Sequence, residues 1–212
     1  MRICVYGAAS PTIDNKYIEL VEKMGQEMAN RGHSLVFGGG GNGLMGAAAR
    51  GVKSGGGYIL GDVPKFFDEE KVEAICDFCD ELIQPDTMRQ RKQLMEDNAD
   101  AFIIVPGGIG TYEEFFEILT LKQLCRHNKP IALYNIMGYY DDINYAMEQA
   151  MKKNFIRDNC KELYYVPDEL DALLRYIETP VDKIRTKGIK RRLIADRCFL
   201  KVIDTENEHR IM

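Results

Sequence analysis

A glycine-rich segment from Val105 to Glu114 combines backbone amides, a hydroxyl group and two carboxylates. It reads VPGGIGTYEE, between an apolar run typical of a strand and a pattern with helical spacing. Glycine lets the backbone approach a ligand closely, and the free amides of a helix start favour an anion such as phosphate. The Thr111 hydroxyl adds one more donor. Because a phosphate would repel Glu113 and Glu114, the segment predicts a phosphorylated ligand with a second, reactive end. The structural alternative is a tight turn capped by Thr111.

A second glycine-rich loop, Gly38–Gly46, also follows a strand and opens a helix. It contains GxGxxG at Gly41, Gly43 and Gly46, and Asp62 lies about twenty residues further on, where a dinucleotide-binding unit places its ribose-binding acid. Against this interpretation, the loop follows the second predicted strand rather than the first. The alternatives are that the two glycine loops cooperate on one mononucleotide, or that Gly43 and Gly46 only allow close packing.

A third loop of small residues follows the first strand at Gly7–Pro11. Its small side chains leave room for a ligand, and Ser10 can donate a hydrogen bond. An ordinary turn explains the same residues.

A basic pair, Arg91 and Lys92, lies near the start of a predicted helix. The two side chains cannot point the same way, but either can reach a ligand crevice from this position. Arginine binds phosphate or carboxylate in a bidentate manner, whereas lysine supplies a mobile point charge. A solvated helix face is the alternative for a pair of this kind.

Strand-like and helix-like segments alternate along the chain, which is typical of a parallel sheet flanked by helices. The predicted strands are Ile3–Tyr6, Leu35–Phe37, Tyr58–Gly61, Glu81–Gln84, Ala101–Val105 and Ile131–Tyr134. The predicted helices are Lys16–Arg31, Gly43–Lys53, Thr87–Asn98, Glu113–Arg126, Tyr140–Asn154 and Glu169–Glu178. We expect a Rossmann-like, doubly wound α/β fold in three layers, with the ligand crevice at the carboxyl ends of the strands.

The length of 212 residues, 45% of them hydrophobic, favours a single domain. We place that domain at residues 1–179, followed by a charged extension at 180–212. The net charge of −5 argues against nucleic-acid binding, and no apolar run has the length of a membrane span. The scattered cysteines suit reduced thiols and a cytoplasmic location. Cys76 and Cys79 form a CxxC, but the second ligand pair of a zinc site is missing.

Together, these motifs resemble the LOG family, long mislabelled as lysine decarboxylases. The family signatures MxxRK and PGGxGTxxE are complete here, at residues 88–92 and 106–114, and the resemblance runs from about Arg2 to Ile177. It implies a Rossmann-like homodimer that hydrolyses the N-glycosidic bond of a nucleoside 5′-monophosphate. The substrate class implied is a cytokinin riboside 5′-monophosphate or AMP, cleaved to free base and ribose 5-phosphate without a cofactor or metal.

The family pattern also implies roles for matching positions, with Arg91 and Glu114 as the catalytic pair. The positions implied to bind substrate are Ser10, Gly43, Met45, Met88, Lys92, Gly107, Gly108, Gly110, Thr111, Glu113 and Thr120. Breaking the C1′–N bond builds oxocarbenium character on the sugar, which a carboxylate stabilises while it orients or deprotonates water. Arg91 would hold the phosphate, position the carboxylate or assist the departing base, and the sequence does not choose among these roles.

Other functions remain as alternatives. The same fold and loops would serve a non-catalytic carrier of a phosphorylated ligand such as molybdenum cofactor. A dinucleotide-dependent enzyme would use Gly41–Gly46 with Asp62. Lysine decarboxylation would require a cofactor such as pyridoxal phosphate, for which no separate lysine site stands out. The segment Pro64–Asp68 lacks the acidic residue that plant-type family members carry there, so the base is left open.

Overall fold

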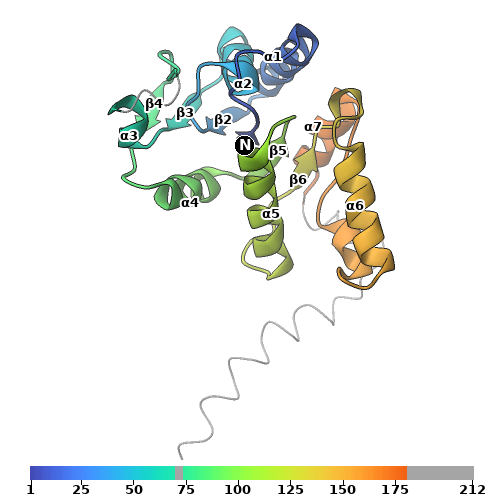
Figure 1. The fold of residues 1–212 in the computed structure, drawn as a ribbon. Helices are drawn as coiled ribbons and strands as arrows, with labels where there is room; N and C mark the ends of the chain where they lie inside the picture. Colours follow the sequence, from blue (N-terminus) through green and yellow to red (C-terminus); the bar gives the residue numbers. More distant parts are fainter. Residues whose placement is uncertain (70–73, 181–212) are drawn as a thin grey trace, which may run out of the picture.

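One parallel sheet organises the chain. The computed structural model describes residues 1–69 and 74–180, and in this part six strands pair in the order β4-β3-β2-β1-β5-β6 (Figure 1). The strands are β1 (Arg2–Tyr6), β2 (Ser34–Phe37), β3 (Ile59–Asp62), β4 (Glu81–Ile83), β5 (Ala101–Ile104) and β6 (Ile131–Leu133). All six predicted strands are confirmed, each boundary to within one residue. Apolar runs identify β1, β2, β3, β5 and β6, because a parallel strand is buried on both faces, whereas the edge strand β4 is largely exposed.

Helices connect the strands. They are α1 (Asn15–Asn30), α2 (Gly43–Ser54), α3 (Lys65–Glu69), α4 (Met88–Asn98), α5 (Ile109–Gln123), α6 (Asp141–Lys152) and α7 (Leu170–Glu178), with 3-10 turns η1 (Ile136–Gly138) and η2 (Asp158–Glu162). The six predicted helices are confirmed, but α5 begins at Ile109 instead of Glu113, because Gly110 is accepted inside its first turn. The short elements α3, η1 and η2 were not predicted, since none is long enough to show periodicity.

Two apolar clusters, one on each face of the sheet, form the core. One contains buried residues of α1, α2 and α7, and the other contains buried residues of α4, α5 and α6. Figure 1 shows α1 and α2 on one side of the strands and α4 and α5 on the other. The predicted three-layer, doubly wound architecture is therefore confirmed.

The order of the strands places a crevice beside β1. The chain runs outward from β1 through β2 and β3 to β4, then returns to β5 on the opposite side of β1. Connections thus diverge at the carboxyl ends of β1 and β5, which is where ligands bind in sheets of this kind. The loop after β1 contacts the loop after β5, because the Ala8 amide donates to the Pro106 carbonyl at 3.1 Å.

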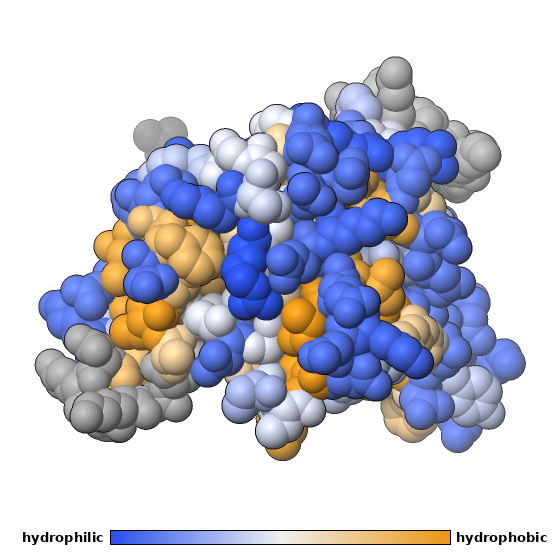
Figure 2. Space-filling model, turned by 90° about the horizontal axis from the view of Figure 1, so that it is seen from above, coloured by the Kyte–Doolittle hydropathy of each residue, from blue (hydrophilic) through white to orange (hydrophobic). Residues whose placement is uncertain are grey.

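The face of the molecule seen in Figure 2 is mainly polar. On the face shown in Figure 2, hydrophilic residues predominate and hydrophobic residues form separate patches between them. None of the described helices has both the length and the apolar character needed to cross a membrane. The predicted extension at 180–212 lies outside the described residues, apart from Pro180.

Candidate active site

The glycine loop after β5 is anchored through three consecutive carbonyl groups. The carbonyl oxygens of residues 105, 106 and 107 accept hydrogen bonds, in that order, from the Tyr140 hydroxyl (2.7 Å), the Ala8 amide (3.1 Å) and the Tyr139 hydroxyl (2.7 Å). The anchors come from two connections, the one after β1 and the one after β6. They fix the backbone by its oxygen atoms, so the loop is held in place before any ligand arrives.

The anchored loop ends at the start of α5, which carries no side-chain cap. Its N-cap residue is Gly108, and the first amides of a helix have no partner within the helix. Gly107 has an internal steric role, since a Cβ there would lie 2.1 Å from the Thr111 hydroxyl oxygen. At Gly108 and Gly110 a Cβ would meet nothing within 4 Å. These two glycines therefore border open space in front of amides that suit an anion.

Arg91 enters the crevice from α4 and is almost completely buried. Its Nε donates to the Asp62 carbonyl at 3.0 Å, and its Nη2 donates to the Gly38 carbonyl at 3.0 Å. The guanidinium also lies over the Phe67 ring, 5.5 Å from the centroid. A Cβ at Gly38 would lie 1.8 Å from Nη2, so this position must be glycine for the guanidinium to lie here. The carboxyl ends of β2 and β3 thus hold the arginine.

The two members of the basic pair point to different neighbours from the first turn of α4. Thr87 and Gln90 form a capping box that fixes the first turn. Lys92, the residue after Arg91, faces α5, where its ammonium pairs with Glu113 and Glu117, each at 2.5 Å. Lys92 is therefore engaged with carboxylates, and only Arg91 of the pair reaches the strand ends.

Glu114 lies on α5, one turn after the glycine loop, and is half-buried. Burial raises the pKa of its carboxyl to about 7, while the charge of Arg91 opposes the shift more strongly than that of Lys92. Glu113 and Glu117 on the same helix raise the pKa further. A carboxyl that titrates near neutral pH can accept a proton from water in the reaction and release it again.

The second glycine loop packs internally at its helix start. Gly43 has a φ of +56°, and a Cβ there would lie 2.6 Å from the Ala8 carbonyl oxygen. The amides of Leu44 and Met45 both donate to that same oxygen, at 2.8 and 3.3 Å. A Cβ at Gly46 would meet the backbone of its own loop at 2.0 Å. Close packing therefore accounts for these glycines.

The segment at residues 74–76 covers the same loop from the other side. The Gly41 amide donates to the Ala74 carbonyl at 2.7 Å, and the Cys76 amide donates to the Gly39 carbonyl at 2.8 Å. Three amides that a pyrophosphate would use, at residues 41, 44 and 45, are thus bonded within the chain. Asp62 is also buried. These contacts argue against a dinucleotide site at this loop.

Three further predicted positions lie around the crevice or beyond it. The Ser10 hydroxyl is exposed and lies 3.0 Å from that of Thr12. The exposed Met88 places its sulfur 4.0 Å from Nη1 of Arg91. Thr120 is exposed on α5, about 13 Å along the helix axis from Thr111 by the rise of 1.5 Å per residue. Thr120 is therefore set back along α5 from the open helix start.

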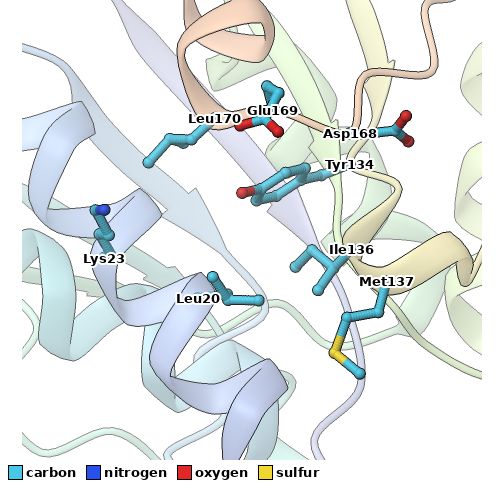
Figure 3. Close-up of a pocket in the computed structure, with 8 residues that line it drawn as sticks. All are labelled: Leu20, Lys23, Tyr134, Ile136, Met137, Asp168, Glu169 and Leu170. Atoms are coloured by element: carbon cyan, nitrogen blue, oxygen red, sulfur yellow. The ribbon is translucent and has the colours of Figure 1, made fainter.

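A cavity of about 240 Å³ lies away from these residues, between α1, the segment after β6 and the start of α7 (Figure 3). Its walls are polar and apolar in about equal parts, with Lys23 on one side and Asp168 and Glu169 on the other. None of the predicted site residues lines it. The volume alone does not make it the reactive site, because the open helix start and the arginine lie elsewhere.

Comparison with known proteins places the chain in a family. A family model described as "Possible lysine decarboxylase" matches residues 45–177. A Mycobacterium tuberculosis protein named cytokinin riboside 5′-monophosphate phosphoribohydrolase is 39% identical over 170 residues, covering 76% of this chain and 89% of the relative. The Arabidopsis thaliana protein of the same name, LOG2, is 34% identical over 182 residues, covering 86% and 84%. The chain belongs to the LOG family of phosphoribohydrolase enzymes.

Solved structures resemble this LOG-family chain at the level of the fold. The molybdenum cofactor carrier protein of Chlamydomonas reinhardtii has a TM-score of 0.61 at 19% identity, covering 86% of this chain and 96% of that one. The protein TM1055 has a TM-score of 0.64 at 21% identity, covering 84% and 98%. At these identities the similarity concerns the Rossmann-like fold alone.

Sequence reasoning missed the contacts that three residues of this LOG-family chain make at the candidate site. Tyr139 and Tyr140 anchor the glycine loop, and their only signal in the sequence was their position directly after the turn that follows a predicted strand. Asp62 was considered only as part of a dinucleotide motif. The structure instead places its carbonyl against Arg91. Contacts between distant segments of this kind leave no local pattern.

Proposed function

We propose that this LOG-family enzyme hydrolyses the N-glycosidic bond of a cytokinin riboside 5′-monophosphate or of AMP. Water adds to C1′ of the ribose, the C1′–N bond breaks, and the products are free base and ribose 5-phosphate. One observation carries the proposal. The uncapped start of α5 offers an anion site, and Glu114, with a pKa raised to about 7 by burial, lies one turn further along the same helix.

The 5′-phosphate is assigned to the amides at the start of α5, with Gly108 and Gly110 giving it room and Thr111 donating a hydrogen bond. The ribose would then extend toward Glu114. Its carboxylate stabilises positive charge on the sugar and takes a proton from the attacking water. Arg91, held by two backbone carbonyls, supplies the positive charge that counters the effect of burial on this carboxylate.

The remaining predicted positions keep supporting roles in the proposal. Ser10 and Met88 line the approach to the crevice, while Gly43 and Met45 shape it from beneath through backbone packing. Lys92 and Glu113 neutralise each other. We therefore assign this pair an effect on the electrostatic potential near Glu114. A lysine held by two carboxylates cannot readily contact the phosphate as well.

The test is an assay for free base with AMP and isopentenyladenosine monophosphate, each beside its dephosphorylated nucleoside. We expect release only from the monophosphates, with kcat/KM rising through about pH 7 as Glu114 ionises. Glu114→Gln should lower kcat by about 100-fold or more, in the range of general base catalysis. Glu113→Gln is the matched control and should cost less than about tenfold, since that carboxylate is exposed and paired with Lys92.

Near-normal turnover by Glu114→Gln would refute the proposed mechanism. Equal release from nucleosides and monophosphates would refute the phosphate site. A wild-type protein that releases no base from any of them, yet retains a phosphorylated ligand through purification, would be a carrier.

We propose further that the enzyme works as a homodimer in the cytoplasm. Free thiols at Cys4, Cys76, Cys79 and Cys160 suit a reducing compartment. The dimer is supported by an apolar stripe on the outer face of α5, formed by Ile109, Phe116 and Leu124, which are all exposed in the single chain. Apolar side chains in such a line mark a surface that a partner covers.

A further inference from the structure

The turn between β6 and α6 leads into the two tyrosines that anchor the glycine loop after β5, and its backbone is unusual. Met137 has a φ of +56° and Gly138 a φ of +76°, so two consecutive residues adopt left-handed conformations. Such a conformation is strained for a residue with a side chain, as Met137 has. At Gly138 a Cβ would lie 2.8 Å from a carboxylate oxygen of Asp141. A turn of this kind keeps its shape only when surrounding contacts hold it.

Asn135 makes these contacts from a position that is 7% exposed. Its Nδ2 donates to Oδ1 of Asp168 at 2.8 Å and to Oδ1 of Asp141 at 2.9 Å, which uses both amide hydrogens. Its Oδ1 accepts a hydrogen bond from the Tyr140 amide at 2.7 Å. The Asn135 backbone amide donates to the Pro167 carbonyl at 2.8 Å. One buried residue therefore joins both ends of the turn to the segment before α7.

The contacts of Asn135 continue to the glycine loop through Tyr140. Tyr140 is the N-cap residue of α6, and its side chain makes no cap hydrogen bond. Its hydroxyl instead donates to the Val105 carbonyl at 2.7 Å, while its backbone amide is held by Asn135. Tyr139, the preceding residue, donates its hydroxyl to the Gly107 carbonyl at 2.7 Å. The side chain of Asn135 thus fixes the backbone from which both anchors extend.

We propose that Asn135 is a positioning residue of the active site. It holds the backbone of Tyr139 and Tyr140 so that their hydroxyl groups reach the loop carbonyls, and these carbonyls set the direction of the amides assigned to the phosphate. Asn135 itself touches neither phosphate nor sugar. The assignment rests on the proposed function, because it requires the phosphate to bind at the start of α5.

Asn135→Ala removes all three side-chain hydrogen bonds, so the loop after β5 should lose its fixed shape. We expect KM for the monophosphate to rise about tenfold, while kcat falls less than about threefold. The smaller effect on kcat follows because Glu114 lies on α5, which Phe115 and Ile118 hold in the core. A residue that only stabilised the fold would lower Tm and leave the KM of the folded enzyme unchanged.

A double-mutant cycle tests whether Asn135 acts through Tyr140. If it does, the combined variant Asn135→Ala/Tyr140→Phe should have a KM within about twofold of the larger single effect, because both changes release the same loop. Two residues that act independently would multiply their effects on KM. Multiplied effects would overturn the proposal.

Asp168 provides a milder pair of variants, which decides the question if Asn135→Ala does not fold. Its exposed side chain accepts one of the two hydrogen bonds from Nδ2 of Asn135. Asp168→Ala removes this acceptor, whereas Asp168→Asn keeps an oxygen there, and both remove the same charge. We expect KM to rise about threefold in Asp168→Ala and to stay near the wild-type value in Asp168→Asn. Equal KM values in the two variants would refute the role of the hydrogen bond.

The matched control is Asn98→Ala, at the end of α4. The Asn98 side chain also makes hydrogen bonds, donating to the Leu94 carbonyl at 2.9 Å and accepting from Nη1 of Arg2 at 3.0 Å. These contacts lead away from the glycine loop. Asn98→Ala should therefore lower Tm and keep the wild-type KM.

The amide resonances of Gly108 and Gly110 separate this proposal from the proposed function. In ¹H–¹⁵N NMR spectra of the free protein, both resonances should move in Asn135→Ala and stay in place in Asn98→Ala. If wild type cleaves no nucleotide, the proposed function fails, while displaced resonances still support the positioning of the loop. If wild type is active, an unchanged KM in Asn135→Ala overturns the positioning role and leaves the proposed function standing.

Discussion

At the scale of single residues, a substitution at Gly110 tests ligand binding without disturbing the fold. Its backbone has no positive φ, and an added Cβ would meet nothing within 4 Å. Alanine also favours a helix over glycine by up to about 1 kcal/mol. Gly110→Ala should therefore keep or raise Tm. The methyl group would occupy the space assigned to the phosphate, so KM for the monophosphate should rise about tenfold or more, a loss of about 1.4 kcal/mol of binding.

The matched control is Gly107→Ala, one turn earlier in the same loop. There the new Cβ would lie 2.1 Å from the Thr111 hydroxyl oxygen, so this variant should lose stability together with activity. Thermal unfolding and steady-state kinetics of both variants distinguish the two cases. A Gly110→Ala enzyme with the wild-type KM would show that the phosphate does not bind at the start of α5.

At the scale of elements, the connection after β6 is expected to hold the catalytic loop. The Tyr140 hydroxyl donates to the Val105 carbonyl from a fully buried position, so Tyr140→Phe leaves that carbonyl without its donor and without water. We expect a loss of about 1–3 kcal/mol in the free energy of unfolding, measured with urea. Tyr139→Phe should cost less than about 1 kcal/mol, because Tyr139 is 37% exposed and water can replace its hydroxyl at Gly107. Equal losses in the two variants would contradict this difference.

The two glycine loops show which features of the candidate site could be predicted from the sequence. Both follow a strand and open a helix, and their positions at one edge of the sheet were predictable from apolar periodicity. Which of the two loops has free amides was not predictable, because this depends on hydrogen-bond partners far away in the chain. The Ala8 carbonyl and residue 74 occupy the amides of the loop after β2. The loop after β5 is held by its carbonyls, and its amides at residues 107–111 have no partner in the part of the chain that the structure describes.

The orientation of the two basic side chains also depends on residues far away in the chain. Its spacing in the sequence showed that Arg91 and Lys92 diverge, but not which one turns inward. That choice depends on Glu113 and Glu117 of another helix, which hold Lys92, and on the absence of a side chain at Gly38, which admits Arg91. Local patterns therefore located the candidate site, and long-range contacts determined the part that each residue plays in it.

At the scale of the whole molecule, α5 presents apolar residues on two faces. Phe115, Ile118 and Leu119 pack into the core, whereas Phe116 and Leu124 lie 39% and 60% exposed on the outer side. Thr120 lies between these two on the outer side, at helical spacing of four residues. A second copy covering this stripe would bury it and would bring Thr120 against the partner.

Phe116→Glu should therefore convert a dimer into a monomer, because the stripe would bury an unpaired charge on association. Sedimentation velocity measures the change, and base release should fall with it if Thr120 completes the partner's site. Phe155→Glu is the control, since Phe155 is 85% exposed and lies beyond α6, away from the stripe. A Phe116→Glu protein that stays dimeric would place the dimer contact elsewhere. A monomer with full activity would show instead that each chain carries a complete site, and would remove Thr120 from the substrate contacts.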